Sequence, residues 1–257
     1  MGRRQQGINR PPYWNELSSE DQQRFSDDNK IAVKDWYLDG TPGLGASTEE
    51  IFYSKTMVDT MIEKILRKET KHHGSYELTT TMLYECLERY PIKNKNVAII
   101  GSVTPWHESL CLAYGGIPTT IEYNKLTTDD SRLNLITVDD YNKNPIEFDA
   151  AFSISSFEHD GLGRYGDPLD PDGDLKAMAK VREQMLKKDG LLYLAVPTGR
   201  DTLWWNAHRI YGMRRWYKLI DGFEMLYTPD SMFRMSLSME HSGREYYQPA
   251  VVLRNKN

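Results

Sequence analysis

The stretch FSISSFEHDGLGRYGD, residues 152–167, holds the side chains of this sequence that are best suited to chemistry. An apolar run with serines is followed at once by Glu158, His159 and Asp160. A buried strand that ends in titratable groups predicts a ligand site at the end of that strand. An imidazole, with an ordinary pKa of about 6.5, can take a proton from a hydroxyl group. We therefore expect His159 to be a catalytic base, with Asp160 as its orienter or as a substrate ligand; the alternative is that His159 only organises the loop.

The next part of the loop offers one guanidinium and one aromatic ring. Arg164 and Tyr165 stand among three glycines, which let the chain bend. A guanidinium fork binds carboxylate or hydroxyl oxygens, and an aromatic ring can cover the apolar face of a sugar. We expect Arg164 and Tyr165 to contact the substrate. The alternative is a structural loop in which Arg164 pairs with Asp167.

Four acidic residues follow at short spacing, and oxygen ligands of this kind could hold Mg²⁺ or Ca²⁺. The run DPLDPDGD, however, contains two prolines and lacks the final bidentate Glu of an EF-hand loop. Asp172 also suits the N-terminal cap of a helix. The pattern therefore argues against a metal site in this run.

The elements that must position these groups alternate between strand and helix after Pro91. Apolar runs predict strands at 97–100, 119–123, 134–138, 148–154 and 191–196, and helical spacing predicts helices at 107–114 and 174–187. Strands separated by helix-length connections form a parallel sheet with helices on both faces. Two last strands, at 223–227 and 249–253, are joined without a long helix and should pair antiparallel at the sheet edge. The predicted fold is α/β: a Rossmann-like three-layer sandwich with a mostly parallel seven-stranded sheet, an antiparallel edge strand and a helical N-terminal extension.

The first part of the chain has a different pattern. Residues 1–12 are polar and predict a flexible leader, and Ser18 can cap a short helix. Ser47 and Glu50 form a capping box that predicts a helix running on through Ile51, with a second helix over 76–89. We expect residues 1–92 to be a helical extension, which covers a cofactor as a lid or simply packs on the sheet, and residues 93–257 to be the Rossmann-like domain.

Composition limits the classes of function. The chain has 257 residues, of which 39% are hydrophobic and 27% charged, and its net charge is −5. This balance argues against nucleic acid as a partner, because phosphate binding needs clustered Lys and Arg. Cys86 and Cys111 lie in apolar contexts, which predicts buried thiols and a reducing compartment. Without a predicted membrane span, we expect the cytoplasm, or the lumen of the secretory pathway if an N-terminal anchor has been removed; the oligomeric state stays open.

Ligands of doubly wound sheets lie outside the carboxyl ends of the strands. Gly101 and Ser102 follow the first strand in the loop GSVTPW, at the start of a helix. A glycine there lets the backbone approach a ligand, although one glycine is a poor match to the dinucleotide pattern G-x-G-x-x-G. Glu122 ends the second strand, where a carboxylate can accept hydrogen bonds from ribose hydroxyls; the alternative is a surface carboxylate.

Further contacts are expected around these residues. Asp139 and Asp140 end the third strand, where they could hold an adenine amino group or act as a turn or helix cap. The predicted cofactor contacts are Gly101, Ser102, Glu122, Tyr123, Asp139, Ser155, Ser156 and Phe157. After the fifth strand, an aromatic and basic segment could grip an acceptor or join the core; it contains Trp204, Trp205, His208, Arg209, Tyr211, Arg214, Arg215 and Trp216.

Taken together, the strand ends and the segments EFDAAFSISSFEHD, KKDGLLYLAVP and DGFEML resemble the class I S-adenosylmethionine-dependent methyltransferases. More narrowly, SSFEHDGLGRYGDPLDPDGD is similar to the family of unknown function DUF268. The resemblance covers about Val97 to Leu253. It departs from the methyltransferase pattern G-x-G-x-G at GSVTPW, where Pro105 removes a backbone donor and Trp106 adds bulk.

The resemblance implies S-adenosylmethionine as cofactor and transfer of its methyl group to a hydroxyl. The aromatic and arginine content favours a sugar or glycan as the acceptor. Two other functions remain open: a non-catalytic binding or scaffold protein of the same fold, and an enzyme that uses a nucleotide-sugar. The loop GSVTPW favours the scaffold; the titratable groups of EHDGLGRYGD favour an enzyme.

Overall fold

Seven strands form the main sheet of the computed structural model, which describes residues 10–40, 51–70, 76–241 and 246–257. In the order of the sheet they are β11 (Phe223–Tyr227), β12 (Ala250–Asn255), β8 (Leu186–Ala195), β7 (Phe148–Ile154), β3 (Asn96–Ile100), β4 (Ile117–Glu122) and β6 (Asn134–Thr137). Neighbours from β8 to β6 pair in parallel, and β12 is antiparallel to both β8 and β11. The predicted α/β sheet is thus confirmed; its antiparallel strand β12 lies second from the edge, because β11 pairs on its outer side.

Alternating side chains of the strands pack against helices on two faces, as a pleated strand requires. On β3, Val97 and Ile99 face one apolar cluster and Ala98 the other. The first cluster includes residues of α2 (Lys55–Leu66), α3 (Glu77–Arg89) and α4 (Trp106–Ala113). The second includes residues of α5 (Val138–Lys143), α6 (Gly173–Lys180), the π-helical turn η3 (Val181–Met185), α7 (Trp216–Leu219) and α8 (Phe233–Ser236). This is the predicted three-layer sandwich.

The N-terminal extension contains strands as well as helices. Besides α1 (Ser19–Phe25) and the short 3-10 helix η1 (Trp14–Glu16), it has β1 (Ala32–Trp36) and β2 (Ile51–Tyr53). β1 pairs in parallel with β9 (Thr202–Asn206), which pairs antiparallel with β10 (His208–Ile210). β2 pairs in parallel with β5 (Leu126–Thr128). Each of these two small sheets joins a strand of the N-terminal extension to a strand of the Rossmann-like part. The domain boundary between residues 92 and 93 stays a prediction.

Serine caps begin two of the helices. Ser18 accepts a hydrogen bond from the Asp21 amide, as expected for α1. The prediction of a helix through Ile51 is wrong, because Ile51 lies in β2. Helix α2 begins at Lys55, and its N-cap is Ser54, whose side chain accepts a hydrogen bond from the Met57 amide. The pairing of β2 with β5 overrides the local helical pattern. The predicted capping box of Ser47 and Glu50 lies outside the described residues.

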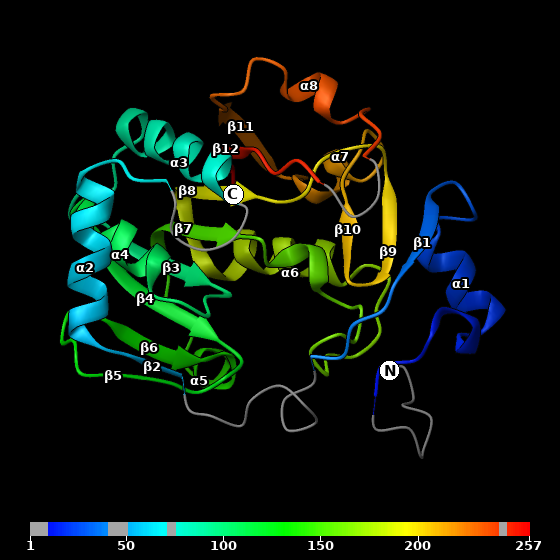
Figure 1. The fold of residues 1–257 in the computed structure, drawn as a ribbon, viewed down its shortest axis with the longest axis horizontal. Coiled ribbons are helices and arrows are strands. Elements are labelled where there is room, and N and C mark those ends of the chain that lie inside the picture. Colours follow the sequence, from blue (N-terminus) through cyan, green and yellow to red (C-terminus); the bar gives the residue numbers. More distant parts are fainter. Residues whose placement is uncertain (1–9, 41–50, 71–75, 242–245) are drawn as a thin grey trace.

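The small sheet β1-β9-β10 lies on the side toward which the arrows of β3, β4 and β7 point (Figure 1). The carboxyl ends of these parallel strands, where a ligand site is expected, therefore face a wall made by the N-terminal extension and the aromatic, basic segment. Trp204 and Trp205 of that segment are buried, so they belong to the packed interior of the wall. No helix in the described ranges is long and apolar enough to cross a bilayer.

Candidate functional site

The loops that follow β3 and β7 touch each other. Gly101 has a φ of +69°, and a Cβ atom at this position would lie 2.4 Å from Ser156 Oγ. Real Cβ atoms do not come this close to other atoms, and a left-handed backbone disfavours any side chain. Glycine is thus required at residue 101 by both the backbone and the neighbouring loop. The predicted cofactor residues Gly101 and Ser156 are brought together.

Beneath this loop lies a buried carboxyl group that the sequence reasoning missed. Ser102 Oγ lies 3.0 Å from Glu108 Oε2 and donates to Thr104 O at 2.9 Å. Thr120 Oγ1 donates to Glu108 Oε1 at 2.7 Å. Burial raises the pKa of Glu108 to about 7. Since the Ser102 hydroxyl has only one hydrogen, a protonated Glu108 satisfies both groups by donating to Ser102.

The N-terminal extension also reaches the glycine loop. The Tyr53 hydroxyl, from β2, donates to Ser102 O at 3.0 Å, and the ring is almost fully buried. Both Ser102 polar groups are therefore held by the protein. The only sequence signal for Glu108 was a carboxylate inside the predicted helix at 107–114, and Tyr53 gave no signal because its contact spans distant segments.

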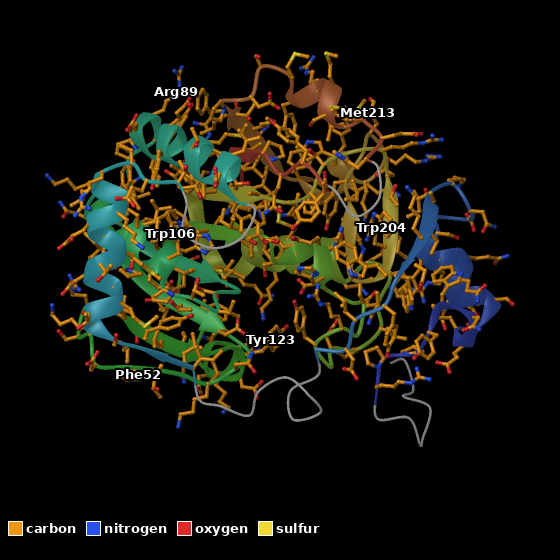
Figure 2. The ribbon with its side chains drawn as sticks, viewed as in Figure 1. Phe52, Arg89, Trp106, Tyr123, Trp204 and Met213 are labelled. Atoms are coloured by element: carbon orange, nitrogen blue, oxygen red, sulfur yellow. The ribbon has the colours of Figure 1, made fainter. Side chains whose placement is uncertain are left out.

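Glu122 ends β4 as a buried carboxylate. Its Oε1 atom accepts from the backbone amide and the side chain of Asn124, at 3.3 and 3.2 Å, and burial raises its pKa. The surface alternative for Glu122 is therefore wrong. Tyr123 is 72% exposed and lies at the end of the same strand (Figure 2).

Two acids of the next loop take different places. Asp139 is exposed in the first turn of α5. Thr137 and Asp140 form the N-cap of that helix: the Asp140 amide donates to Thr137 Oγ1 at 3.1 Å, and this hydroxyl donates to the Asp140 carboxylate at 2.7 Å. Although the Tyr123 side chain is largely exposed, partial desolvation raises its pKa, and Asp160, Asp167, Glu122 and Asp139 add to the rise, so these acids share one neighbourhood.

A chain of hydroxyl groups leads to Glu158. The Tyr76 hydroxyl, at the N-cap of α3, donates to Ser155 Oγ at 3.0 Å, and Ser155 Oγ donates to Glu158 Oε1 at 2.7 Å. Glu158 is 1% exposed, and its Oε2 atom has no hydrogen-bond partner in the described part of the chain. Burial raises the pKa of Glu158 to about 7. A buried carboxyl with an unused oxygen, beside the end of β7, makes Glu158 a candidate site residue.

His159 lies in the 3-10 helix η2 (Phe157–His159) and is held by a backbone carbonyl. Its Nδ1 atom is 2.6 Å from Ala207 O, so Nδ1 carries the hydrogen and Nε2 keeps a free lone pair. The Nε2 atom is 3.8 Å from Glu158 Oε1. Burial, with a contribution from Arg164, lowers the pKa of His159 to about 3. The ring is thus a neutral imidazole in a fixed orientation.

The group that orients His159 is not Asp160, which the sequence predicted. The Ala207 carbonyl holds the ring, and no hydrogen bond joins Asp160 to His159 among the described residues. Burial and the neighbouring Asp167 raise the pKa of Asp160 well above its ordinary value. Asp160 as an orienter is therefore wrong, and its role as a substrate ligand stays a prediction. Phe157 packs its side chain into the core, and its role as a cofactor contact also stays a prediction.

Arg164 does not pair with Asp167. Its Nη1 atom donates to Ala207 O at 3.1 Å, and its guanidinium lies 4.8 Å from the centre of the Tyr165 ring. Asp167 instead accepts backbone hydrogen bonds from Gly161, Gly163 and Tyr165, at 2.8, 3.2 and 3.2 Å, and so shapes the loop. The Tyr165 ring meets the His159 ring edge-on at 5.6 Å. His159, Arg164 and Tyr165 are thus brought together as predicted.

A buried ion cluster supports this loop from behind. Asp174 contacts both Arg209 and Arg215 and accepts from the Tyr211 hydroxyl at 2.9 Å. Although burial would raise it, the pKa of Asp174 is held below its ordinary value by the two guanidiniums. Arg209 also donates to Asp160 O at 2.6 Å and so fixes the backbone next to His159. These arginines are structural, which the sequence pattern left open.

The acidic run contributes no metal centre in the described residues, where no group of three or more His, Cys, Asp or Glu side chains could hold a metal ion. Asp170 instead pairs with Lys176 and accepts from the Asp172 amide at 3.1 Å. Cys86 and Cys111 are buried free thiols, as predicted, and burial raises the pKa of both.

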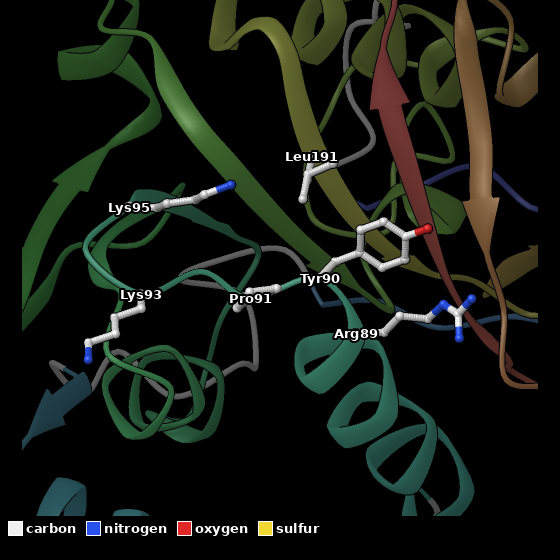
Figure 3. Close-up of a pocket in the computed structure, with 6 residues that line it drawn as sticks. All are labelled: Arg89, Tyr90, Pro91, Lys93, Lys95 and Leu191. Carbon is white, nitrogen blue, oxygen red and sulfur yellow. The ribbon is translucent and has the colours of Figure 1, made fainter.

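A surface hollow of about 370 Å³ lies far from this site, at the amino end of β3 (Figure 3). It is lined by Arg89, Tyr90, Pro91, Lys93, Lys95 and Leu191. Ligands of parallel sheets bind at the carboxyl ends of the strands, so this hollow is at the wrong end for the chemistry of His159.

Comparisons of the fold give similar solved structures of low identity. One is a 1,6-didemethyltoxoflavin-N1-methyltransferase from Burkholderia thailandensis with bound S-adenosylhomocysteine, at 14% identity and a TM-score of 0.49, covering 67% of this chain and 76% of that one. A SAM-dependent methyltransferase from Methanosarcina mazei has 15% identity and a TM-score of 0.45, covering 68% and 98%. The 4+2 cyclase SpnF has 14% identity and a TM-score of 0.48, covering 86% and 99%.

Sequence comparison gives a family. A search of curated proteins found no match. The family described as "Caenorhabditis protein of unknown function, DUF268" matches residues 94–255, which include every strand of the main sheet and both loops that meet at Gly101. Because this match covers more than half of the chain and includes the GLGRYGDP loop, the protein belongs to the DUF268 family.

Proposed function

We propose that this protein is an S-adenosylmethionine-dependent O-methyltransferase that acts on a hydroxyl group of a sugar or glycan. The observation that carries the proposal is the contact between Gly101 and Ser156. Ser156 precedes His159 by three residues in the sequence, so the glycine loop meets the segment that carries His159. A cofactor loop and a neutral imidazole with a free nitrogen thus share one edge of the sheet. Proton removal and orientation are what a protein must add to methyl transfer.

The residues at this edge fit the cofactor. Gly101 has no side chain to stand between the backbone and a ligand, and the direction that a Cβ would take is filled by Ser156, so a ligand would approach the loop from another side. Glu122 is a buried carboxylate able to accept hydrogen bonds from ribose hydroxyls, and Asp139 is exposed nearby for an adenine amino group. Tyr123 offers an exposed ring, and Ser155 and Ser156 line the loop opposite. When bound, the cofactor supplies an electrophilic methyl group.

His159 and Glu158 would handle the proton of the acceptor hydroxyl. Because Ala207 holds Nδ1–H, the free lone pair is on Nε2, which can accept the proton. With a pKa of about 3 the ring alone is a weak base, so the proposal needs an ionised Glu158, whose Oε1 atom lies 3.8 Å from Nε2, to stabilise the imidazolium formed. Arg164 and Tyr165 would hold the acceptor beside this pair.

Calorimetric titration with S-adenosylhomocysteine tests the cofactor assignment. We expect saturable binding to the parent chain, a loss of at least ten-fold in affinity for Glu122→Ala, and affinity within two-fold of the parent for His159→Ala. Asp139→Asn tests the adenine contact separately, since this residue is exposed and its removal leaves the core intact. A folded parent that does not bind the compound would exclude the proposal.

A non-catalytic scaffold is the second candidate, and one observation favours it. The Ser102 hydroxyl and carbonyl are both engaged by the protein, through Thr104, Glu108 and Tyr53, so this loop offers fewer free groups to a cofactor. Competition between S-adenosylhomocysteine and nucleotide-sugars separates the candidates. Displacement of S-adenosylhomocysteine by a nucleotide-sugar would indicate an enzyme that uses nucleotide-sugars. Binding of neither compound would indicate the scaffold.

A further inference from the structure

Arg164 has a positive charge that lacks a carboxylate partner in the described residues. Its Nη1 atom donates to Ala207 O and lies 3.4 Å from His159 Nδ1, itself a donor to the same carbonyl. The Nε atom is buried and makes no hydrogen bond within the described ranges. Arg209 and Arg215, by contrast, share the carboxylate of Asp174. A partly buried guanidinium without an anion is costly, which is typical of a group that awaits a ligand.

The groups around Arg164 are two neutral imidazoles and two acids whose pKa values are raised. His208 packs beside His159, with ring centres 6.3 Å apart, and its buried Nε2 atom has no hydrogen-bond partner in the described chain. Burial, with a contribution from Arg164, lowers the pKa of His208 to about 4, so both imidazoles are neutral at pH 7. Burial raises the pKa of the nearby Glu158 to about 7, against the charge of Arg164, and raises that of Asp160 well above its ordinary value, so ionised Glu158 is a neighbour of this guanidinium only above about pH 7. The site therefore has one permanent positive charge.

Aromatic rings surround these donors. Trp36 and Tyr246 meet the His208 ring edge-on, at 5.1 and 5.3 Å between centres, and the Arg164 guanidinium lies 4.8 Å from the centre of the Tyr165 ring. Such walls lower the local dielectric constant and so strengthen a charge-assisted hydrogen bond to Arg164. A site with these rings, one permanent cation and two neutral imidazoles suits an organic anion that also carries hydroxyl groups.

We propose that the acceptor carries a carboxylate in addition to its hydroxyl, and that the Nε edge of Arg164 binds this carboxylate. The inference rests on the proposed function and names the acceptor class of the same site. A carboxylate fits better than a phosphate monoester, because the latter carries almost two charges at pH 7 and would need a second cation. Arg209 and Arg215 cannot supply it, since Asp174 already pairs with both.

Matched acid and neutral probes test the proposal by calorimetry, with and without saturating S-adenosylhomocysteine. The pairs are D-glucuronate with D-glucose and salicylate with phenol, and inorganic phosphate is a separate arm. We expect at least one acid to bind saturably and at least ten-fold more tightly than its neutral partner. Equal affinity within both pairs, no saturable binding of either acid, or tighter binding of phosphate would overturn the proposal.

Variants assign the binding to Arg164. Arg164→Gln should lose at least ten-fold in affinity for the acid, Arg164→Lys should lose less, and the exposed control Arg200→Gln should match the parent. Circular dichroism and thermal melting show whether Arg164→Gln is folded. If it is not, the acid affinity of Arg164→Lys decides the assignment, because a planar guanidinium fork and a point charge bind a carboxylate differently. Unchanged acid affinity in the folded Arg164 variants would overturn the assignment.

The same titrations separate the two proposals. Binding of S-adenosylhomocysteine without selective binding of either acid would remove the carboxylate acceptor and leave the methyltransferase proposal in place. Selective, Arg164-dependent binding of an acid without binding of S-adenosylhomocysteine would remove the methyltransferase and leave a carboxylate site.

Discussion

The Nε2 atom of His159 lies 3.8 Å from Oε1 of Glu158, while the other ring nitrogen is held by the Ala207 carbonyl. This relationship fixes one tautomer and one orientation of the imidazole. It also places side by side two groups whose pKa values are shifted by burial, to about 3 for His159 and to about 7 for Glu158. A neutral base next to a carboxyl that ionises near neutral pH is an arrangement suited to moving one proton.

The first prediction concerns the pH dependence of methyl transfer to an acceptor found by the titrations above. Glu158 supports His159 only when it is ionised, so kcat should rise with pH through about 7 and then level off. His159, with a pKa of about 3, stays neutral throughout and adds no second step. Glu158→Gln should remove this rise and lower kcat by roughly 100-fold.

The matched control is Glu183→Gln, because that side chain is half exposed and its ion pair in the described part of the chain is with the neighbouring Arg182. Its pH profile should equal that of the parent. Affinity for S-adenosylhomocysteine should stay within two-fold for both variants, since neither residue is a proposed cofactor contact. A flat profile in the parent between pH 6 and 8 would argue against ionised Glu158 as the supporting group.

The second prediction concerns Glu108 and stability. Its pKa is about 7 in the folded chain, above its ordinary value of 4.5, so the folded state holds the proton more tightly than the unfolded state. The stability that this group contributes is fully present below pH 4.5 and is lost as pH rises through about 7. Glu108→Gln cannot ionise, so it should gain stability relative to the parent by roughly 2–3 kcal/mol between pH 4.5 and 8.

Urea unfolding of both chains at several pH values measures this difference. Glu158, His159 and His208 also have shifted pKa values, but they are present in both chains and cancel in the comparison. A constant difference between parent and variant across this range would mean that Glu108 ionises in the folded chain as it does in water.

Local pattern was enough to predict the central sheet. Apolar runs such as Val97–Ile100 and Phe148–Ile154 are long enough to be buried strands, and the helix-length segments between them leave only parallel pairing. Gly101, Glu122 and His159 were predicted as site residues because each lies at the end of such a strand or in the loop that follows it. Their positions depend on chain order and strand ends, which the sequence records.

Contacts between distant segments were not predictable in the same way. Ala32 pairs with Thr202 across β1 and β9, and Ile51 pairs with Leu126, yet nothing local in either segment names its partner. Tyr53 and Tyr76 reach the site through such contacts. For this reason a lid over a cofactor could be suggested for the N-terminal extension, but the residues that reach the site could not be named.

The third prediction tests the ion cluster behind the loop. Asp174→Asn would leave Arg209 and Arg215 without their shared carboxylate, although their side chains are only 4% and 13% exposed. Breaking a buried pair in this way should lower the free energy of unfolding by about 3–5 kcal/mol. The exposed pair of Arg200 and Glu240 is the control, and Glu240→Gln should change little. Similar losses in both variants, measured by urea unfolding, would contradict a structural role for the cluster.

The fourth prediction separates the two reasons for glycine at residue 101. Gly101 and Gly115 have similar left-handed backbones, with φ of +69° and +75°. At Gly115 the nearest atom to an added Cβ is Lys93 Cγ at 3.3 Å, on a flexible side chain, whereas at Gly101 it is Ser156 Oγ at 2.4 Å. Gly115→Ala should therefore cost only the backbone term of about 1–2 kcal/mol. Gly101→Ala should cost more and should lower affinity for S-adenosylhomocysteine by at least ten-fold.

A double variant isolates the contact itself. Ser156→Gly removes both Oγ and Cβ, the two atoms that an alanine at residue 101 would meet, at 2.4 and 2.9 Å. In the Gly101→Ala background it should recover part of the lost melting temperature, while the backbone strain remains. If it also restores binding of S-adenosylhomocysteine, the contact had acted by displacing the loop. If stability returns but binding does not, the absence of a side chain at residue 101 is itself what the ligand requires.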